Sequence, residues 1–524
     1  MPHRIRPGWV FFASIALLAG FVVMAAIAPE RVSAGADAAL AFTTVNFGWL
    51  YLFATTGFLV FCVLLAISRY GELRLGHDDE TPEFSFPAWL GMIFSAGMGV
   101  GLVFWGVAEP MSHYNEPPLG QAVPRTAEAS GLALRYSIFH WGFHQWANFA
   151  IVGLAIAYVR FRRLGRGLIS ETFRPHLGDR VDGGWGYAID VLAVVSTIVG
   201  VATTLGLGVI QLNSGLHDVA GTAVGVGAQL AILAGIGVIF LLCALTPLDR
   251  GIRYVSNVNM LLAATLLVFV FLAGPTPFLT AAMTNMVGEY IGNVIGMSLV
   301  MQPFTGEDWV ERWTIFYWAW GLSWAPFVGS FIARISRGRT IREFVTGVIG
   351  VPVALSIVWF ATFGGTALYH EMFSDAGIAD AVQQDLGSAL FATLAQLPYS
   401  TVAAVLALVL VALFVITSAN SATFVLGMFT MKGMLDPYRW VRVTWGGVQL
   451  VVAAMLLLTG GLAALQTVSI VAAFPFMVLM IFMAASLLRG LQDERREMEA
   501  REREFRARLA QLIPDPETDE GPDR

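Results

Sequence analysis

Long apolar stretches separated by short polar ones run along the chain from its N-terminus to about residue 488. A stretch of about 20 apolar residues is the length that an α-helix needs to cross the hydrocarbon core of a bilayer. The sequence therefore predicts an all-α integral membrane protein with twelve transmembrane helices. The predicted spans are residues 8–27, 46–68, 87–107, 137–159, 187–211, 228–247, 256–273, 313–333, 344–366, 399–427, 440–460 and 464–488.

The segment between the seventh and eighth predicted spans has a different pattern. Apolar residues recur there with a helical period, but polar residues interrupt them within 277–302, at Thr284, Asn285, Glu289, Tyr290 and Asn293. A helix of this kind lies in the membrane interface with its apolar face towards the acyl chains. We therefore expect an amphipathic surface helix here.

The composition agrees with a membrane protein. Only 13% of the residues are charged and 56% are hydrophobic, whereas a soluble domain carries about 25% charged residues. The net charge of −6 gives no reason to expect a nucleic-acid partner. Cys62 and Cys243 lie inside apolar stretches, so we expect small core residues rather than a disulfide.

The distribution of basic residues predicts the orientation. With twelve spans both termini lie on one side, and 27 of the 31 lysines and arginines fall on that side. Cytoplasmic loops carry the excess of basic residues, so both termini are predicted to be cytoplasmic, in a bacterial inner membrane. Residues 8–27 follow basic residues and could instead be a cleaved signal peptide, but their length favours a retained helix.

The last segment, residues 489–524, is highly charged. Glutamate precedes arginine by four residues at Glu497, Glu499, Glu502 and Glu504, which supports a helix. We expect this helix to end near Ile513 and to be followed by a short acidic disordered end. The tail is either a solvated helix without a further role or a regulatory arm that contacts lipid headgroups or cytoplasmic loops.

Glycine and proline interrupt two of the predicted spans. The third span has three alternate glycines within 97–101, and the eighth has two glycines and a proline within 320–329. Backbone groups freed inside a bilayer must find protein, an ion or cavity water. Broken helices in corresponding positions mark the central site of many transporters. The alternative explanation is that these glycines only allow neighbouring helices to pack closely.

Each interrupted span opens a run of five spans, and the two runs enter the membrane from opposite sides, so any repeat is inverted. The predicted organisation is an N-terminal segment with two extra spans, a first repeat, the surface helix, a second repeat and a cytoplasmic tail. These occupy residues 1–85, 86–273, 274–309, 310–488 and 489–524.

Aromatic residues gather near the interrupted helices. Trp141 and Trp146 flank His144 in the fourth span, and the eighth span has four tryptophans at 313, 318, 320 and 324. Indole faces attract a cation that cannot donate hydrogen bonds, although such residues also serve in bundle packing. His140 and His144 have a spacing that could hold a metal, but we expect structural hydrogen bonding. Glu109 is interpreted as an anchor at the end of the third span.

Hydroxyl groups in the tenth span suggest a cation site. Thr417 and Ser418 could join the carbonyl groups of Ser95, Met98 and Phe414 in a shell of five uncharged oxygens. Such a shell suits Na⁺ better than H⁺, because no carboxylate is available there to titrate. Adjacent hydroxyls can also simply bond back to preceding carbonyls.

Taken together, these segments resemble the betaine/choline/carnitine transporter family. The matching stretches are residues 97–101, 105–110, 140–144 with Trp146, 316–320, 323–324, 326–329, 332–344 (IARISRGRTIREF) and 417–419. The resemblance implies a leucine-transporter-like core of two inverted five-helix repeats, often assembled as a homotrimer. It also implies Na⁺ at Thr417 and Ser418, and no organic cofactor. The implied substrate-binding residues are Trp141, Trp146, Phe149, Trp320, Gly321, Trp324, Met98 and Gly99.

Several positions depart from the family pattern. Gly321 stands where a tryptophan usually forms one wall of the cage, and Gln145 and Phe149 replace a proline and a tyrosine. Because removing an indole opens space, we expect a bulkier or less strictly trimethylated substrate, and Gly321→Trp should then sharpen betaine binding. Val201 replaces a threonine, so a second sodium site is expected to be weak or absent, whereas Gly101 resembles the sodium-coupled members.

The sequence thus predicts secondary active import, by alternating access, of an osmolyte of the glycine betaine, choline or carnitine type, coupled to Na⁺. The alternatives are an exchanger or H⁺-coupled carrier of a bulkier ectoine or sulfonium osmolyte, and a membrane sensor without transport. An enzyme is disfavoured, because no nucleophile–base pair or metal-ligand set is evident.

Overall fold

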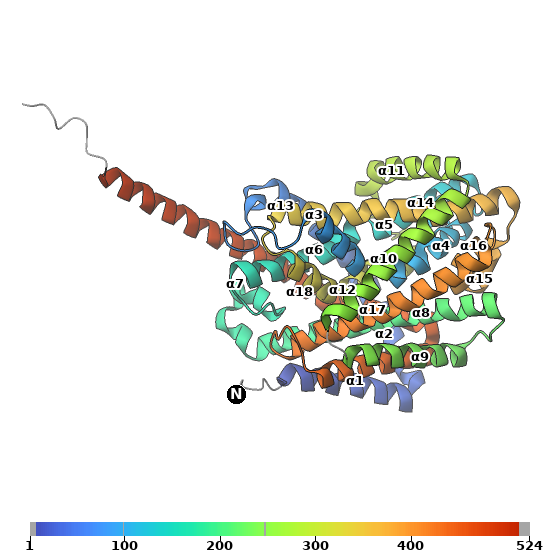
Figure 1. The fold of residues 1–524 in the computed structure, drawn as a ribbon, viewed down its shortest axis with the longest axis horizontal. Coiled ribbons are helices and arrows are strands. Elements are labelled where there is room, and N and C mark those ends of the chain that lie inside the picture. The colour runs from blue at the N-terminus through green and yellow to red at the C-terminus, as the bar shows by residue number, and fades with distance from the viewer. Residues whose placement is uncertain (1–6, 98, 246–247, 513–524) are drawn as a thin grey trace, which may run out of the picture.

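The computed structural model describes residues 7–97, 99–245 and 248–512, without the side chains of 94–97, 248–254 and 510–512. Within these residues the regular structure is helical, apart from one isolated β-bridge between Arg74 and Thr340. Figure 1 shows the helices packed side by side in one elongated bundle. The expected all-α fold is therefore confirmed.

Eleven α-helices occur in the described part of the chain between residues 9 and 298. These are α1 (Trp9–Ile27), α2 (Pro29–Ile67), α3 (Phe86–Gly97), α4 (Val100–Asn115), α5 (Ala127–Trp141), α6 (Phe143–Ala157), α7 (Arg174–Leu177), α8 (Gly184–Ala220), α9 (Val226–Leu245), α10 (Leu248–Ala273) and α11 (Thr276–Ser298).

The remaining α-helices follow a π-helical turn at Glu311–Ile315. They are α12 (Phe316–Ile335), α13 (Ile341–Val345), α14 (Val351–Ser374), α15 (Ile378–Gln384), α16 (Ala389–Leu394), α17 (Ser400–Thr430) and α18 (Arg439–Leu512).

Eight helical stretches in the described part of the chain are long and apolar enough to cross a membrane. One of them is α18, which contains both of the last two predicted spans. Between those spans the backbone leaves helical geometry, because Gly461 has φ 56° and ψ −129°, a left-handed conformation that favours glycine. The fold is that of an integral membrane protein.

The predicted interruption of the third span is present. Helix α3 ends at Gly97 and α4 begins at Val100, and Gly99 between them has φ −132° and ψ −145°. Met98 lies outside the described residues. The chain therefore leaves helical geometry where the alternate glycines predicted.

The predicted interruption of the eighth span is wrong. Helix α12 runs continuously from Phe316 to Ile335 with Pro326 inside it. A proline removes only one ladder bond, and α12 is held along its length by α6. At Gly329 a Cβ would be 2.9 Å from the backbone nitrogen of Gly153, so this glycine serves close helix packing, the alternative considered above.

An interruption that the pattern did not indicate divides the fourth predicted span. Helix α5 begins already at Ala127 and ends at Trp141, and α6 begins at Phe143. Gly142 between them has φ −92° and ψ −141°. A single glycine in an apolar stretch gave no signal of this break, because its cause is a contact with a distant helix described below.

The expected surface helix is α11. It lies along α14 at one edge of the bundle in Figure 1. Its buried side includes Met286 and Tyr290, whereas Ile291 and Ile295 are exposed. An exposed apolar face on a helix with polar residues agrees with a position at the membrane interface.

The C-terminal part of α18 projects away from the bundle in Figure 1, and it is helical as far as the structure describes it. Of the four glutamate–arginine pairs expected in the tail, Glu502–Arg506 and Glu504–Arg508 form ion pairs. Where the tail leaves the bundle, Glu494 pairs with Arg162. The tail therefore contacts the π-helical turn Tyr158–Arg162 that follows α6, whereas a regulatory role stays a prediction.

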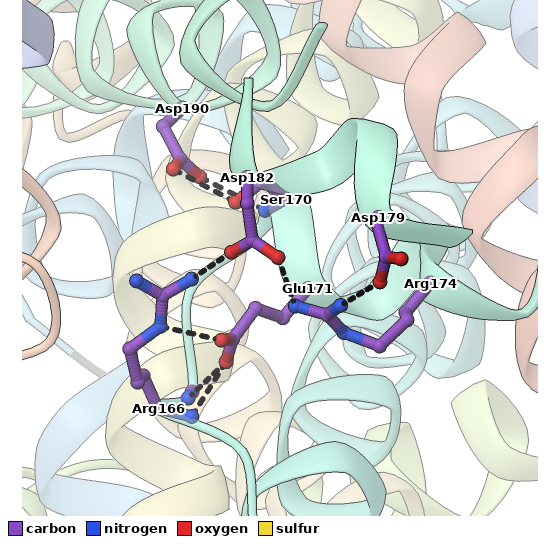
Figure 2. A network of polar contacts seen from close by, with 8 residues as sticks. Arg166, Ser170, Glu171, Arg174, Asp179, Asp182 and Asp190 are labelled. Carbon is purple, nitrogen blue, oxygen red and sulfur yellow. Dashed lines mark hydrogen bonds and ion pairs between the residues drawn. The ribbon is translucent and has the colours of Figure 1, made fainter. Parts of the chain in front are cut away.

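Figure 2 shows the polar network in the segment that joins α6 to α8. Arg166 pairs with Glu171 at 2.6 Å and with Asp182 at 2.7 Å. Arg174 reaches the other oxygen of Asp182 at 2.9 Å. The hydrogen bond from Arg174 lowers the pKa of Asp182. The two pairs with Asp182 are exposed, so they order the loop more than they stabilise the fold, whereas the carboxylate of Glu171 is buried.

We predict that Arg162→Ala destabilises the protein more than Arg174→Ala. Arg162 is only 9% exposed and pairs with Glu494, which is 7% exposed, and with Asp78 at 2.5 Å. Removing it leaves a buried carboxylate without its cation, which costs on the order of 3 kcal/mol, against less than about 1 kcal/mol for an exposed pair. Thermal unfolding in detergent measures both changes, and equal shifts in Tm would contradict the prediction.

Candidate functional site

Two indole rings approach the start of α4 closely. A Cβ on Gly101 would lie 2.8 Å from Cη2 of Trp141 and closer still to Cη2 of Trp320. The rings also contact each other edge to face, with centroids 5.9 Å apart. Only glycine leaves room for this arrangement. The structure therefore brings the interruption between α3 and α4 together with the end of α5 and the first turns of α12.

Both indoles are held at the ring N–H. Trp141 Nε1 donates to Glu109 Oε2 at 2.9 Å, and Trp320 Nε1 donates to the backbone oxygen of Gly200 at 3.4 Å. Phe316 stacks on Trp320 with centroids 6.0 Å apart and planes at 6°. A hydrogen bond at the ring edge orients an indole while its faces stay available for apolar or cationic groups.

The other aromatic residues predicted to form the substrate cage, which are Trp146, Phe149 and Trp324, divide into two sets. Trp324 joins the first pair, with its centroid 6.3 Å from that of Trp320. Trp146 and Phe149 form a second pair on α6, with centroids 5.5 Å apart. All of these rings are buried. The aromatic cluster thus comes from α5, α6 and α12, although the ring contacts do not join the two sets directly.

The space expected beside Gly321 is filled. A Cβ on Gly321 would lie closer than 3.0 Å to Cδ, Oε1 and Nε2 of Gln145. The expectation of an opened cavity at this position is therefore wrong, because the amide of Gln145 takes the room that an indole would need. Gly321→Trp alone would clash, so it does not test whether this wall shapes the site.

Glu109 is the centre of a buried polar cluster rather than an anchor at a helix end, because α4 continues to Asn115. His140 Nδ1 lies 2.6 Å and His113 Nε2 3.3 Å from Glu109 Oε1. The other nitrogen of His140 is 2.9 Å from Thr314 Oγ1. All of these side chains, Thr314 included, are buried. Sequence reasoning missed the cluster because its members come from different helices.

Glu109, His113 and His140 also offer ligand atoms that all lie within 4.8 Å of one another, so they could hold a transition metal. Hydrogen bonds already account for the arrangement, since both nitrogens of His140 have partners. His140 and His144 do not act as a pair, because His144 Nε2 is 2.9 Å from Ser298 Oγ. The expectation of structural hydrogen bonding agrees with this geometry.

The break between α5 and α6 is stabilised by α11. The N–H of Phe143 donates to Oη of Tyr290 at 2.9 Å. A Cβ on Gly142 would collide with the same hydroxyl group, which explains the glycine. Since a freed backbone donor inside a bilayer must be satisfied, Tyr290 lets the chain bend between Trp141 and Trp146. The polar positions of α11 therefore have a structural role as well as an interfacial one.

The predicted cation site lies only partly within the described residues. Ser95 is in the part of α3 whose side chains are not described, and Met98 lies outside the described residues. On α17, Ser418 Oγ is 3.4 Å from the place that a Cβ on Gly99 would take. One of the two predicted hydroxyl groups therefore faces the interrupted backbone.

The second predicted hydroxyl group has protein partners. Thr417 Oγ1 donates to the carbonyl of Leu413 at 2.9 Å and accepts from Asn259 Nδ2 at 3.0 Å. The carbonyl oxygen of Phe414 is 3.2 Å from the same hydroxyl group. Uncharged oxygens beside unwound backbone are the kind of ligand that transporters use for Na⁺. The oxygen ligands that these residues offer are of the type that suits Na⁺, and the site stays a prediction.

A cavity of about 790 Å³ lies next to the aromatic cluster. Its lining contains Trp105, Trp313 and Phe316, and Phe316 stacks on Trp320. Carboxylates dominate its charged lining, which contains Asp37, Glu307, Asp308, Glu311 and Arg312. A negative vestibule raises the local concentration of cationic groups.

We predict that Gly101→Ala strongly lowers activity at this site. The added methyl group overlaps Trp141 and Trp320, and overpacking of this kind typically costs about 1–3 kcal/mol. Gly91→Ala is the matched control, because a Cβ there meets no atom within 4 Å. Solute uptake, normalised to protein in the membrane, measures the difference. Equal activity of the two variants would show that the close approach is not needed.

We predict that Glu109 acts through Trp141. Glu109→Ala removes the hydrogen bond that holds the Trp141 N–H and should raise KM for the solute roughly tenfold, with a smaller change in kcat. In a Trp141→Phe background, which lacks the N–H, the same substitution should have little further effect on KM. Uptake kinetics of the four proteins measure this, and additive effects would mean that Glu109 acts elsewhere.

Comparison with known proteins agrees with the resemblance. Residues 9–496 match the model of the betaine/carnitine/choline family transporters. The chain is 45% identical over 493 residues to the ectoine/hydroxyectoine transporter of Virgibacillus pantothenticus, covering 94% of this chain and 97% of that protein. It is 46% identical over 497 residues to the glycine betaine transporter OpuD of Bacillus subtilis, covering 94% and 96%. A match over nearly its whole length shows that this chain belongs to the betaine/carnitine/choline transporter family.

Proposed function

We propose that the chain is a secondary active importer of a zwitterionic osmolyte, of the betaine or ectoine type, that couples uptake to Na⁺ and works by alternating access. The observation that carries this proposal is the meeting of Trp141 and Trp320 at the interrupted start of α4. Indole faces beside unwound backbone suit a cationic headgroup, and interrupted helices are typical of the central site of transporters.

Members of this family are transporters and not enzymes, so the chain moves a small osmolyte across a membrane. Its arrangement as twelve spans, with inverted repeats at 86–273 and 310–488 and both termini in the cytoplasm of a bacterium, is part of the proposal. The basic residues and the family support this arrangement. The argument from two broken helices is weaker, because α12 is continuous.

Na⁺ is the proposed coupling ion because the available ligands are uncharged oxygens. Ser418 Oγ faces Gly99 at the interruption, and Thr417 lies beside it in the same helix. An H⁺-coupled carrier is the second candidate. It is favoured by Glu109, a buried carboxylate in direct contact with Trp141, because ionisable groups in the membrane often serve proton relays.

Uptake by transporter-deficient bacteria tests the proposal. Cells that express the chain should accumulate labelled glycine betaine or ectoine in Na⁺ medium and much less when K⁺ replaces Na⁺. Ser418→Ala should raise the Na⁺ concentration for half-maximal uptake, whereas Ser400→Ala, at the first residue of α17, should not. Uptake that does not depend on Na⁺ but increases with the pH gradient would favour H⁺ coupling. Absence of osmolyte uptake would contradict the proposed function.

A further inference from the structure

Helices α6 and α12 meet at a glycine and an amide. A Cβ on Gly321 would overlap Cδ, Oε1 and Nε2 of Gln145, so the amide lies directly against Gly321 of α12. The amide takes the place where a larger residue at 321 would begin. The identity of residue 321 and that of residue 145 therefore depend on each other.

This contact belongs to the aromatic cluster. On α12, Gly321 follows Trp320 and shares a helix face with Tyr317 and Trp324, which are four residues before it and three after it. On α6, Gln145 directly precedes Trp146. The amide therefore lies between the helix that carries Trp146 and the helix that carries Trp320 and Trp324, against the Cβ position of residue 321.

The oxygen of this amide also lacks a partner among the described residues. Gln145 is 8% exposed, and its Oε1 has no hydrogen bond within the part of the chain that the structure describes. Asn148, three residues further along α6, is fully buried, and neither its Nδ2 nor its Oδ1 has a partner there. Buried polar groups are nearly always hydrogen-bonded, so unpaired ones need an explanation.

An unpaired amide alone does not make a site. Gln449 in α18 is fully buried, and its Oε1 and Nε2 also have no partner among the described residues. The difference is position, because Gln145 lies against the helix that carries Trp320 and Trp324. Gln145 thus combines an unused acceptor with direct contact to the helix that carries two of the residues proposed to hold a cation.

We infer that Gln145 and Gly321 form a specificity-determining pair, which selects a zwitterion whose cationic group carries N–H donors, such as a cyclic amidinium carboxylate, over a trimethylammonium zwitterion. This inference rests on the proposed function and names the class of substrate for that site.

The physical reason is the different chemistry of the two cations. A trimethylammonium group has no N–H, so beside Gln145 it would leave the buried carbonyl without a partner, and it would miss the indole face that Gly321 removes. A flat amidinium ring can donate to Oε1 and still stack on the remaining indoles. Sites built to bond an N–H reject analogues that lack it, because the buried acceptor is then unpaired.

The test compares ectoine, a cyclic amidinium carboxylate, with glycine betaine in bacteria that express the full chain. The ratio of their half-saturation constants does not depend on how much protein reaches the membrane. Gln145→Met has nearly the length of glutamine and no acceptor. We expect this substitution to raise the half-saturation constant for ectoine at least about tenfold. The half-saturation constant for glycine betaine should change less than about threefold.

Gln449→Met is the matched control, since it removes an equally buried and unpaired amide elsewhere, and it should leave the ratio unchanged. The inference would be overturned if Gln145→Met left the ratio of the two half-saturation constants unchanged, or if Gln449→Met changed it equally. In either case, osmolyte uptake by the unaltered chain would still support the proposed function. Loss of all osmolyte uptake in the unaltered chain would overturn both.

A second variant tests the pair in the opposite direction. Gln145→Pro with Gly321→Trp removes the amide and supplies an indole, and residue 145 is in the first turn of α6, where proline is tolerated. This double variant should prefer glycine betaine to ectoine, whereas Gly321→Trp alone should be poorly active because of the clash. A double variant that keeps the preference of the unaltered chain would also contradict the inference.

Discussion

The contact of two indoles with one glycine is the constraint on which the site depends. Trp141 and Trp320 can share the start of α4 only because Gly101 has no side chain. This contact brings α4, α5 and α12 together, and it places an edge of each ring at Gly101, two residues after the interruption at Gly99. Since packed interiors leave little room for adjustment, the helices around this point are positioned by it.

Around that contact, the protein satisfies polar groups by bringing partners from distant helices. Glu109 holds Trp141 through its N–H, and Tyr290 accepts the hydrogen bond that the break at Gly142 frees. In a membrane such partners are needed, because water is not available to replace them. The unpaired amide of Gln145 is an exception to this pattern, and its position in the cluster makes it the feature most directly related to substrate choice.

Local patterns were sufficient where the physical signal lies in neighbouring residues. Apolar length predicted the helices, alternate glycines predicted the break between α3 and α4, and polar interruptions predicted a separate helix α11. The same reasoning failed at Pro326, where packing against α6 keeps α12 continuous. It also missed the break at Gly142, which depends on Tyr290, more than a hundred residues away.

The sequence by itself determined the membrane class, the family and the residue types of the site, because hydrophobic length and specific motifs are properties of the chain. Only the tertiary structure decided which of those residues meet. It joined Glu109 to His140 and Trp141, and it filled the place beside Gly321 with Gln145. Contacts between helices depend on how their surfaces pack. The residue pattern of one helix does not identify the residues of another helix that it will contact.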